Sequence, residues 1–162
     1  MTPHVDIVEM YFTACKFSDC ADFCMRVQQE RETLSYFYTD PGIVNAAFSC
    51  EVSSKLLLYL EQINYKKEHR LKQLFEMLPP KIQEAVKHKT TEKCGYWNDA
   101  WGREILLQIS DAFIKWRYIY ETDWSKNAAI HIDISYLFAF RDALKVMCEK
   151  KLEHKAGPNG VL

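Results

Sequence analysis

The sequence predicts an all-α protein, a bundle of five or six helices, and three observations support this fold class. Apolar residues recur at three- and four-residue steps through most of the chain, as on the buried face of a helix. No segment alternates apolar and polar residues in the manner of a strand. An apolar content of 48% in 162 residues is enough to build one core. We therefore expect one helical domain over residues 1–155 and a disordered tail over residues 156–162.

The first helical segment covers about residues 5–38 and carries one apolar stripe. Ser18-Asp19 can interrupt this stripe, so one long helix and two shorter helices both fit the segment. The polar stretch 26–32 is expected to face solvent. The stripe consists of Val5, Val8, Phe12, Cys15, Cys20, Phe23, Cys24 and Val27.

The second segment is expected to be the central helix of the bundle. It follows the turn signal Asp40-Pro41-Gly42 and runs without Gly or Pro to Asn64. Most of its sides are apolar, which is typical of a helix surrounded by others, with Leu57 and Leu60 at the centre. Glu51 and Lys55 are four residues apart in the favourable order, so we expect a structural ion pair. The alternative is a carboxylate that orients a functional Arg or His.

The rest of the chain predicts further helices separated by polar or proline-containing stretches. Pro79-Pro80 ends one helix, and Pro80 can occupy the first turn of the next. The segments are a short amphipathic helix at 68–78, a short helix from Pro80, a loop at 88–96, a helix at 97–117, a loop at 122–127 and a last helix at 134–152.

The charge balance excludes a general affinity for polyanions, because 21 basic residues face 22 acidic ones. A nucleic-acid site would have to be a local patch. The most basic stretch, residues 66–89, also contains acidic residues, so we interpret it as a solvated face. The start of the chain lacks the pattern of a signal peptide, and no window approaches a membrane span of about 20 apolar residues. We therefore expect a cytoplasmic protein without membrane contact.

The six cysteines are interpreted as reduced and mostly structural, because no CxxC pair occurs. Cys20 and Cys24 could hold half of a zinc site, completed by His4 or Cys94. Buried cysteines that act as small hydrophobes explain the same pattern, and we favour this interpretation. The sequence therefore predicts no metal site and no cofactor.

Four short motifs occur in an order that resembles the HEPN superfamily, small helical domains of prokaryotic toxin, phage-defence and CRISPR-associated systems. The resemblance covers roughly residues 40–150. It implies an HEPN-like fold and a defence or toxin–antitoxin context. The motifs are the Ala-rich helix 46–58 with Glu51 and Lys55, the segment 69–78 with His69, Leu71 and Leu74, the aromatic-basic run 117–121, and Arg141-Asp142 in the last helix.

Many HEPN members are metal-independent ribonucleases that place an Arg, a polar residue and then a His after four to six further residues. In such a pair the His moves a proton from the ribose 2′-hydroxyl and the Arg stabilises phosphate charge. Arg141-Asp142 matches the opening of this signature, but no His follows at the required spacing. The weak catalytic candidates are therefore Arg141 with His131 or His69 as a replacement base. For His69 we favour a structural role.

Arg117, Tyr118 and Arg141 are the candidate RNA-binding residues. Aromatic rings and guanidinium planes stack on unpaired bases, and Tyr120 extends the same run. The alternative, which we favour on sequence, is that the tyrosines bury their rings against the bundle and Arg117 neutralises the end of its helix.

Three hypotheses for function follow. The first is a non-catalytic module that binds RNA or a partner protein, and the resemblance implies a homodimer. The second is a metal-independent endoribonuclease with a rearranged Arg/His pair. The third is an unrelated helical adaptor whose grooves hold a peptide or small ligand. The missing Arg-to-His spacing separates the first two on sequence and favours the first.

Overall fold

The computed structural model describes residues 5–31, 37–65, 67–95, 106–110, 112–121 and 132–156. These residues are helical wherever they have regular structure, and they contain no strand, so the predicted all-α class is confirmed. Residues 106–110 are also helical. The labelled elements are α1 (Ile7–Glu30), α2 (Thr39–Leu60), α3 (Leu71–Met77), α4 (Pro80–Cys94), α6 (Ala112–Arg117), the 3-10 turn η1 (Ile119–Glu121) and α7 (Ile134–Ala156).

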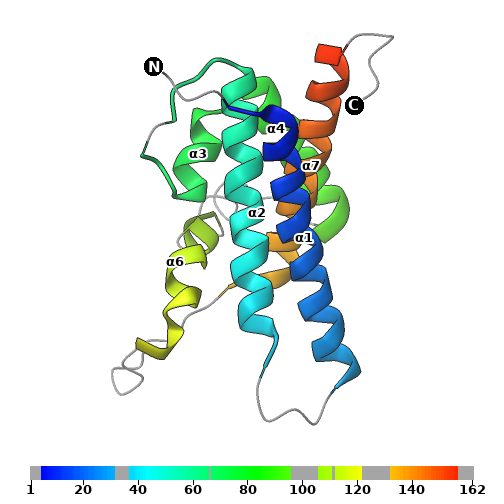
Figure 1. Ribbon diagram of the computed structural model, residues 1–162, viewed down its shortest axis with the longest axis vertical. Coiled ribbons are helices and arrows are strands. Elements are labelled where there is room, and N and C mark those ends of the chain that lie inside the picture. The colour runs from blue at the N-terminus through cyan, green and yellow to red at the C-terminus, as the bar shows by residue number, and fades with distance from the viewer. Residues whose placement is uncertain are drawn as a thin grey trace.

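Helix α2 runs through the middle of the bundle, as predicted. It contacts α1, α3, α6 and α7, while α4 packs against α7. Figure 1 shows α1 beside α2, with α3 and α6 along the opposite side. Leu57 is fully buried, as expected, whereas Leu60 is only partly buried and packs against the margin of the core. Burial on most sides explains why apolar residues surround this helix.

By length and composition, α2 is long and apolar enough to cross a membrane. The expectation that no window approaches a membrane span was therefore wrong for this helix. In the bundle, 67% of its most apolar 18-residue window is buried inside the protein. The apolar character of α2 is thus accounted for by its central position in the core.

Small residues bring α1 and α2 close together. A methyl group built on Gly42 would lie 3.3 Å from the Cβ of Cys24 and 3.1 Å from the Sδ of Met25. Further along, the hydroxyl of Ser49 donates to the backbone carbonyl of Ala14 at 2.8 Å. This hydrogen bond satisfies a buried hydroxyl at the helix contact.

The structure corrects the start of α2. We predicted a turn at Asp40-Pro41-Gly42, but these residues form the first turn of the helix, which begins at Thr39. Proline fits there because the first amides of a helix have no partner within the helix. The amide of Gly42 then donates to the carbonyl of Tyr38 at 3.1 Å.

The structure also corrects the ends of three helices. Helix α4 continues through most of the stretch that we predicted as the loop 88–96. It ends at Cys94 and is capped by Gly95, whose φ of 82° lies in the left-handed region that glycine favours. The last helix reaches Ala156, which we had placed in the tail; residues 157–162 lie outside the described residues. Likewise, only 106–110 and 112–117 of the predicted helix 97–117 are described, and both stretches are helical. The first segment forms one helix that ends at Glu30 rather than near residue 38.

Candidate functional site

The first charged group, which we call the Arg141 cluster, consists of Arg141, Asp22, Asp142 and Lys93. Arg141 lies on α7 and is only 3% exposed. Its Nη1 donates to Asp22 on α1 at 2.8 Å, and its Nη2 donates to Asp142 at 2.7 Å. The guanidinium carbon also lies 4.5 Å from the centroid of the Phe138 ring. The cation is thus enclosed by two carboxylates and an aromatic face.

These neighbours keep the cluster ionised. Burial opposes the charge of Asp142, but Lys93 and Arg141 outweigh it and hold the pKa of Asp142 below its ordinary value. Burial likewise opposes the charge of Arg141, but Asp22 and Asp142 outweigh it, so the pKa of Arg141 is raised. Lys93 on α4 forms an ion pair with Asp142. The cluster therefore joins α1, α4 and α7 through charges that neutralise one another.

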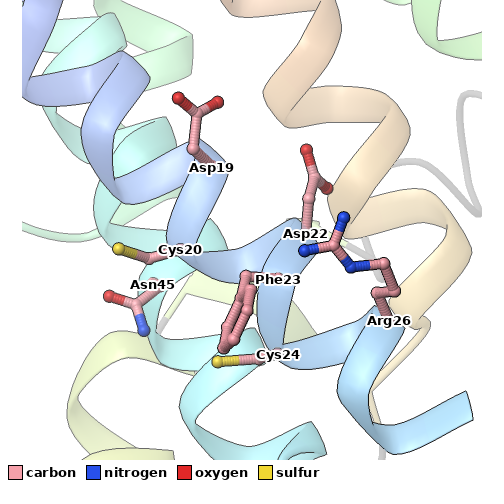
Figure 2. A pocket seen from close by; sticks show the side chains of 7 residues that line it. All are labelled: Asp19, Cys20, Asp22, Phe23, Cys24, Arg26 and Asn45. Carbon is pink, nitrogen blue, oxygen red and sulfur yellow. The ribbon is translucent and has the colours of Figure 1, made fainter. Parts of the chain in front are cut away.

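Open hollows lie beside this cluster. One has a volume of about 770 Å³ and lies along α1 next to Asn45 of α2. Figure 2 shows that Asp22 and Arg26 point to the α7 side of Phe23. A second hollow of about 390 Å³ also includes Asp22 and Arg26, together with Phe138. Arg141 lines neither hollow, because its side chain is buried beneath Asp22.

The second group, which we call the Glu51 cluster, consists of Glu51, Lys55 and His69. The side chain of Glu51 is buried in α2, and its Oε1 accepts from Lys55 Nζ at 2.7 Å. The Nδ1 atom of His69 lies 2.8 Å from the same oxygen. The predicted pairing of Glu51 with Lys55 is thus confirmed. The alternative noted above, a carboxylate that orients a functional His, stays a prediction, and the contact it requires is made to His69.

The backbone before α3 places His69 in this cluster. The Oε1 of Glu68 accepts the amides of His69 and Arg70 at 3.0 and 2.9 Å. The side chain of Arg70 donates to both Glu68 oxygens, and this bonding lowers the pKa of Glu68 to about 2. Leu71 and Leu74 then anchor α3 in the core. We predicted that His69 lies within a helix at 68–78. In the structure it precedes α3, which begins at Leu71.

Two features make the Glu51 cluster unusual. The second carboxylate oxygen of Glu51, Oε2, is buried and has no hydrogen-bond partner among the described residues. Buried carboxylate oxygens are normally paired. The side chain of His69 is 60% exposed, and no described residue hydrogen-bonds its Nε2. A buried anion thus holds one ring nitrogen of a side chain that is mostly exposed.

A third group, the aromatic patch, consists of Arg117, Tyr118 and Tyr120. The guanidinium carbon of Arg117 lies 4.6 Å from the Tyr118 ring centroid, and its Nη2 donates to the Tyr118 hydroxyl at 2.9 Å. The two tyrosine rings meet edge to face at 6.3 Å. Tyr120 is 75% exposed and Tyr118 is 39% exposed. Our favoured expectation that these tyrosines bury their rings was therefore wrong.

The structure does not combine the catalytic candidates into one site. The recorded ionic partners of Arg141 lie on α1 and α7, whereas the side-chain partners of His69 lie on α2. Among the described residues no ion pair or hydrogen bond links Arg141 with His69. His131 lies outside the described residues.

The described cysteines and acidic residues do not gather into a metal site. Within the described ranges, no group of three or more His, Cys, Asp or Glu side chains is arranged to hold a metal ion. Cys20 and Cys24 line the large hollow together, and His4 lies outside the described residues.

Sequence reasoning missed Asp22 and Lys93 as partners in the Arg141 cluster. Asp22 is 119 residues from Arg141, and Lys93 belongs to a stretch that we predicted as a loop. No periodicity or motif in the chain relates these positions. The sequence could indicate only one partner of Arg141, namely Asp142, because that residue directly follows it.

No protein-family model matches this chain, and comparisons with curated proteins and with solved structures find no match either.

Proposed function

We propose that this chain is an HEPN-like helical domain that acts as a non-catalytic binding module for single-stranded RNA. The observation that carries the proposal is the exposure of the aromatic patch. Tyr120 presents most of its ring to solvent, and Tyr118 and Arg117 lie directly beside it. Aromatic and guanidinium faces of this kind stack on unpaired bases.

The ring geometry suits stacking more than groove binding. The Arg117 guanidinium carbon contacts the Phe113 and Tyr118 rings, at 4.8 and 4.6 Å from their centroids. A guanidinium held in this way loses little conformational freedom when it meets a phosphate or a base. Double-stranded RNA offers no free base faces, so the patch favours single strands.

The environment of Arg141 supports a non-catalytic module. Its guanidinium is buried and paired with Asp22 and Asp142, so a phosphate would have to displace a carboxylate to reach it. Arginine cannot serve as a general base near neutral pH, because its pKa stays above about 12. We therefore remove Arg141 from the proposed RNA contact and assign it to holding the helices together. A homodimer and a defence or toxin–antitoxin context stay part of the proposal on the strength of the HEPN resemblance.

The test is fluorescence anisotropy with a labelled single-stranded RNA of mixed sequence, at low and moderate salt. Stacking contributes about 1–3 kcal/mol per base, so Tyr120→Ala should weaken binding by roughly 5- to 150-fold. Phe23→Ala is the matched control, because it removes another exposed ring from a different helix. The matching duplex should bind more weakly than the single strand.

Three outcomes would contradict the proposal: no binding at low salt, equal loss in the Phe23 and Tyr120 variants, or preference for the duplex. RNA integrity is followed on a gel in the same samples, with and without chelator. Cleavage without metal that His69→Ala or His131→Ala abolishes would establish the ribonuclease alternative.

A further inference from the structure

The Glu51 cluster has the arrangement of an activated nucleophile, which RNA binding does not use. Glu51 Oε1 lies 2.8 Å from Nδ1 of His69, and the carboxylate is buried. An ionised carboxylate only accepts hydrogen bonds, so Nδ1 carries the proton in this pair. In the neutral imidazole, Nε2 then keeps its lone pair, and this nitrogen belongs to a side chain that is mostly exposed.

The burial of Glu51 gives this orientation a chemical consequence. When Nε2 attacks an electrophile, the ring becomes cationic while Nδ1 keeps its proton. A buried carboxylate hydrogen-bonded to Nδ1 stabilises that positive charge, as the aspartate of a Ser-His-Asp triad does. Lys55 shares Oε1 and offsets part of the Glu51 charge, whereas solvent screens this buried carboxylate less than it would a surface one.

The unpartnered Oε2 of Glu51 is an independent observation that points to function. Buried carboxylate oxygens are normally hydrogen-bonded, although Ser53 and Ser54 of the same helix also have buried hydroxyls with no partner among the described residues. Here both described donors, Lys55 Nζ and His69 Nδ1, converge on Oε1, while Oε2 has no partner among the described residues. The 3.3 Å distance between Lys55 Nζ and His69 Nδ1 reflects these two donors sharing one acceptor.

We propose that Nε2 of His69 is a phosphoryl-acceptor site, oriented by Glu51. Lys55 is paired with Glu51 and Arg70 with Glu68, so the charges around the ring balance, and an anionic electrophile would be recognised through these ammonium and guanidinium donors rather than through net positive charge. The phosphoryl donor is a small anion with a P–N or acyl-phosphate bond. The modification goes beyond RNA binding and does not depend on it.

The step balances with phosphoramidate as the donor. The Nε2 lone pair forms the new N–P bond, and the P–N bond of the donor breaks. Its electron pair leaves with the donor nitrogen as ammonia, since that nitrogen is already protonated. Nδ1 keeps its proton, and the charge that appears on the ring is paired with Glu51. No oxidant, reductant or metal takes part.

The chain contains its own control histidine. His88 lies 3.5 Å from Glu92 on the surface of α4, so it has a carboxylate partner on Nδ1, but both side chains are exposed. The two histidines differ in the burial of the carboxylate, in its distance from Nδ1, and in the Lys55 ammonium that lies 3.3 Å from Nδ1 of His69.

The experiment treats the purified full-length chain with potassium phosphoramidate and follows labelling by intact mass and by site-resolved fragmentation under non-acidic conditions. We expect His69 to be phosphorylated at least on the order of tenfold faster than His88. Glu51→Gln keeps the side-chain shape and removes the charge, so it should lower labelling of His69 to the rate of His88. Glu92→Gln should leave labelling of both histidines unchanged.

Equal labelling of His69 and His88 in the unmodified protein would overturn the proposal. So would an unchanged His69 rate in a Glu51→Gln variant that keeps its helical circular dichroism. If Glu51→Gln does not fold, the comparison of His69 with His88 in the unmodified chain decides alone.

Discussion

The Arg141 and Glu51 clusters both pair carboxylates with cationic or imidazole side chains, but they differ in which partner is buried. In the Arg141 cluster the cation is buried, and two carboxylates that are more exposed than it surround it. In the Glu51 cluster the anion is buried, and an exposed imidazole is attached to it. Both clusters join segments that are distant in the sequence.

The difference concerns which partner remains available to solvent. Arg141 is enclosed, and its ion pair with Asp22 links α7 to α1. The ring of His69 is 60% exposed, so the same kind of ion pair leaves one reactive atom free to meet a reagent. A buried charge with exposed partners is expected to contribute mainly to stability, whereas a buried orienting group with an exposed partner can contribute to chemistry.

The largest expected effect tests the structural side of this comparison. Arg141→Ala removes the buried cation and leaves Asp22 and Asp142 without their shared partner. We expect a loss of about 3 kcal/mol in the free energy of unfolding, at the lower end for buried pairs because Asp142 keeps Lys93. Urea denaturation followed by circular dichroism measures this loss. A change below about 0.5 kcal/mol, the size of an ordinary surface substitution, would show that Arg141 is not structural.

A smaller effect should appear as acid sensitivity. The pKa of Asp142 is held below its ordinary value of 3.8, so its contribution to stability is present above that value. The contribution is lost as the pH falls through the lower pKa of the folded state. Asp142→Asn lacks it, so the stability difference between the two proteins should shrink as the pH falls below 3.8. Denaturant midpoints measured from pH 7 downward check this, and a difference independent of pH would contradict it.

The smallest effect on stability is expected for His69→Ala. This side chain is mostly exposed, and Glu51 keeps its pair with Lys55, so the loss should stay within about 0.5 kcal/mol. The same variant should lose the fast phosphoryl label completely. Urea denaturation and mass spectrometry of one sample thus separate stability from reactivity. A loss as large as that of Arg141→Ala would show that the two clusters do not differ in role.

The sequence by itself determined the contacts that lie within one helix. The three- and four-residue spacing predicted the all-α fold and the central position of α2. The i, i+4 spacing predicted the Glu51–Lys55 pair, because these positions face each other on any α-helix. The ends of helices were less well predicted. Proline in the first turn of α2 and the late Gly95 cap of α4 follow local backbone rules that the apolar pattern does not reveal.

Only the tertiary structure decided which side chains from different helices meet and how deeply each is buried. His69 joins Glu51 across 18 residues, and Asp22 joins Arg141 across 119. Such pairs depend on which helix faces pack together, and helical periodicity fixes the face of each helix but not its neighbour. Packing also decided the exposure of Tyr120. The apolar pattern could not show whether another helix covers this ring, and no described part of the bundle does. Burial is a property of the whole packed chain, and it separates the enclosed arginine from the available histidine.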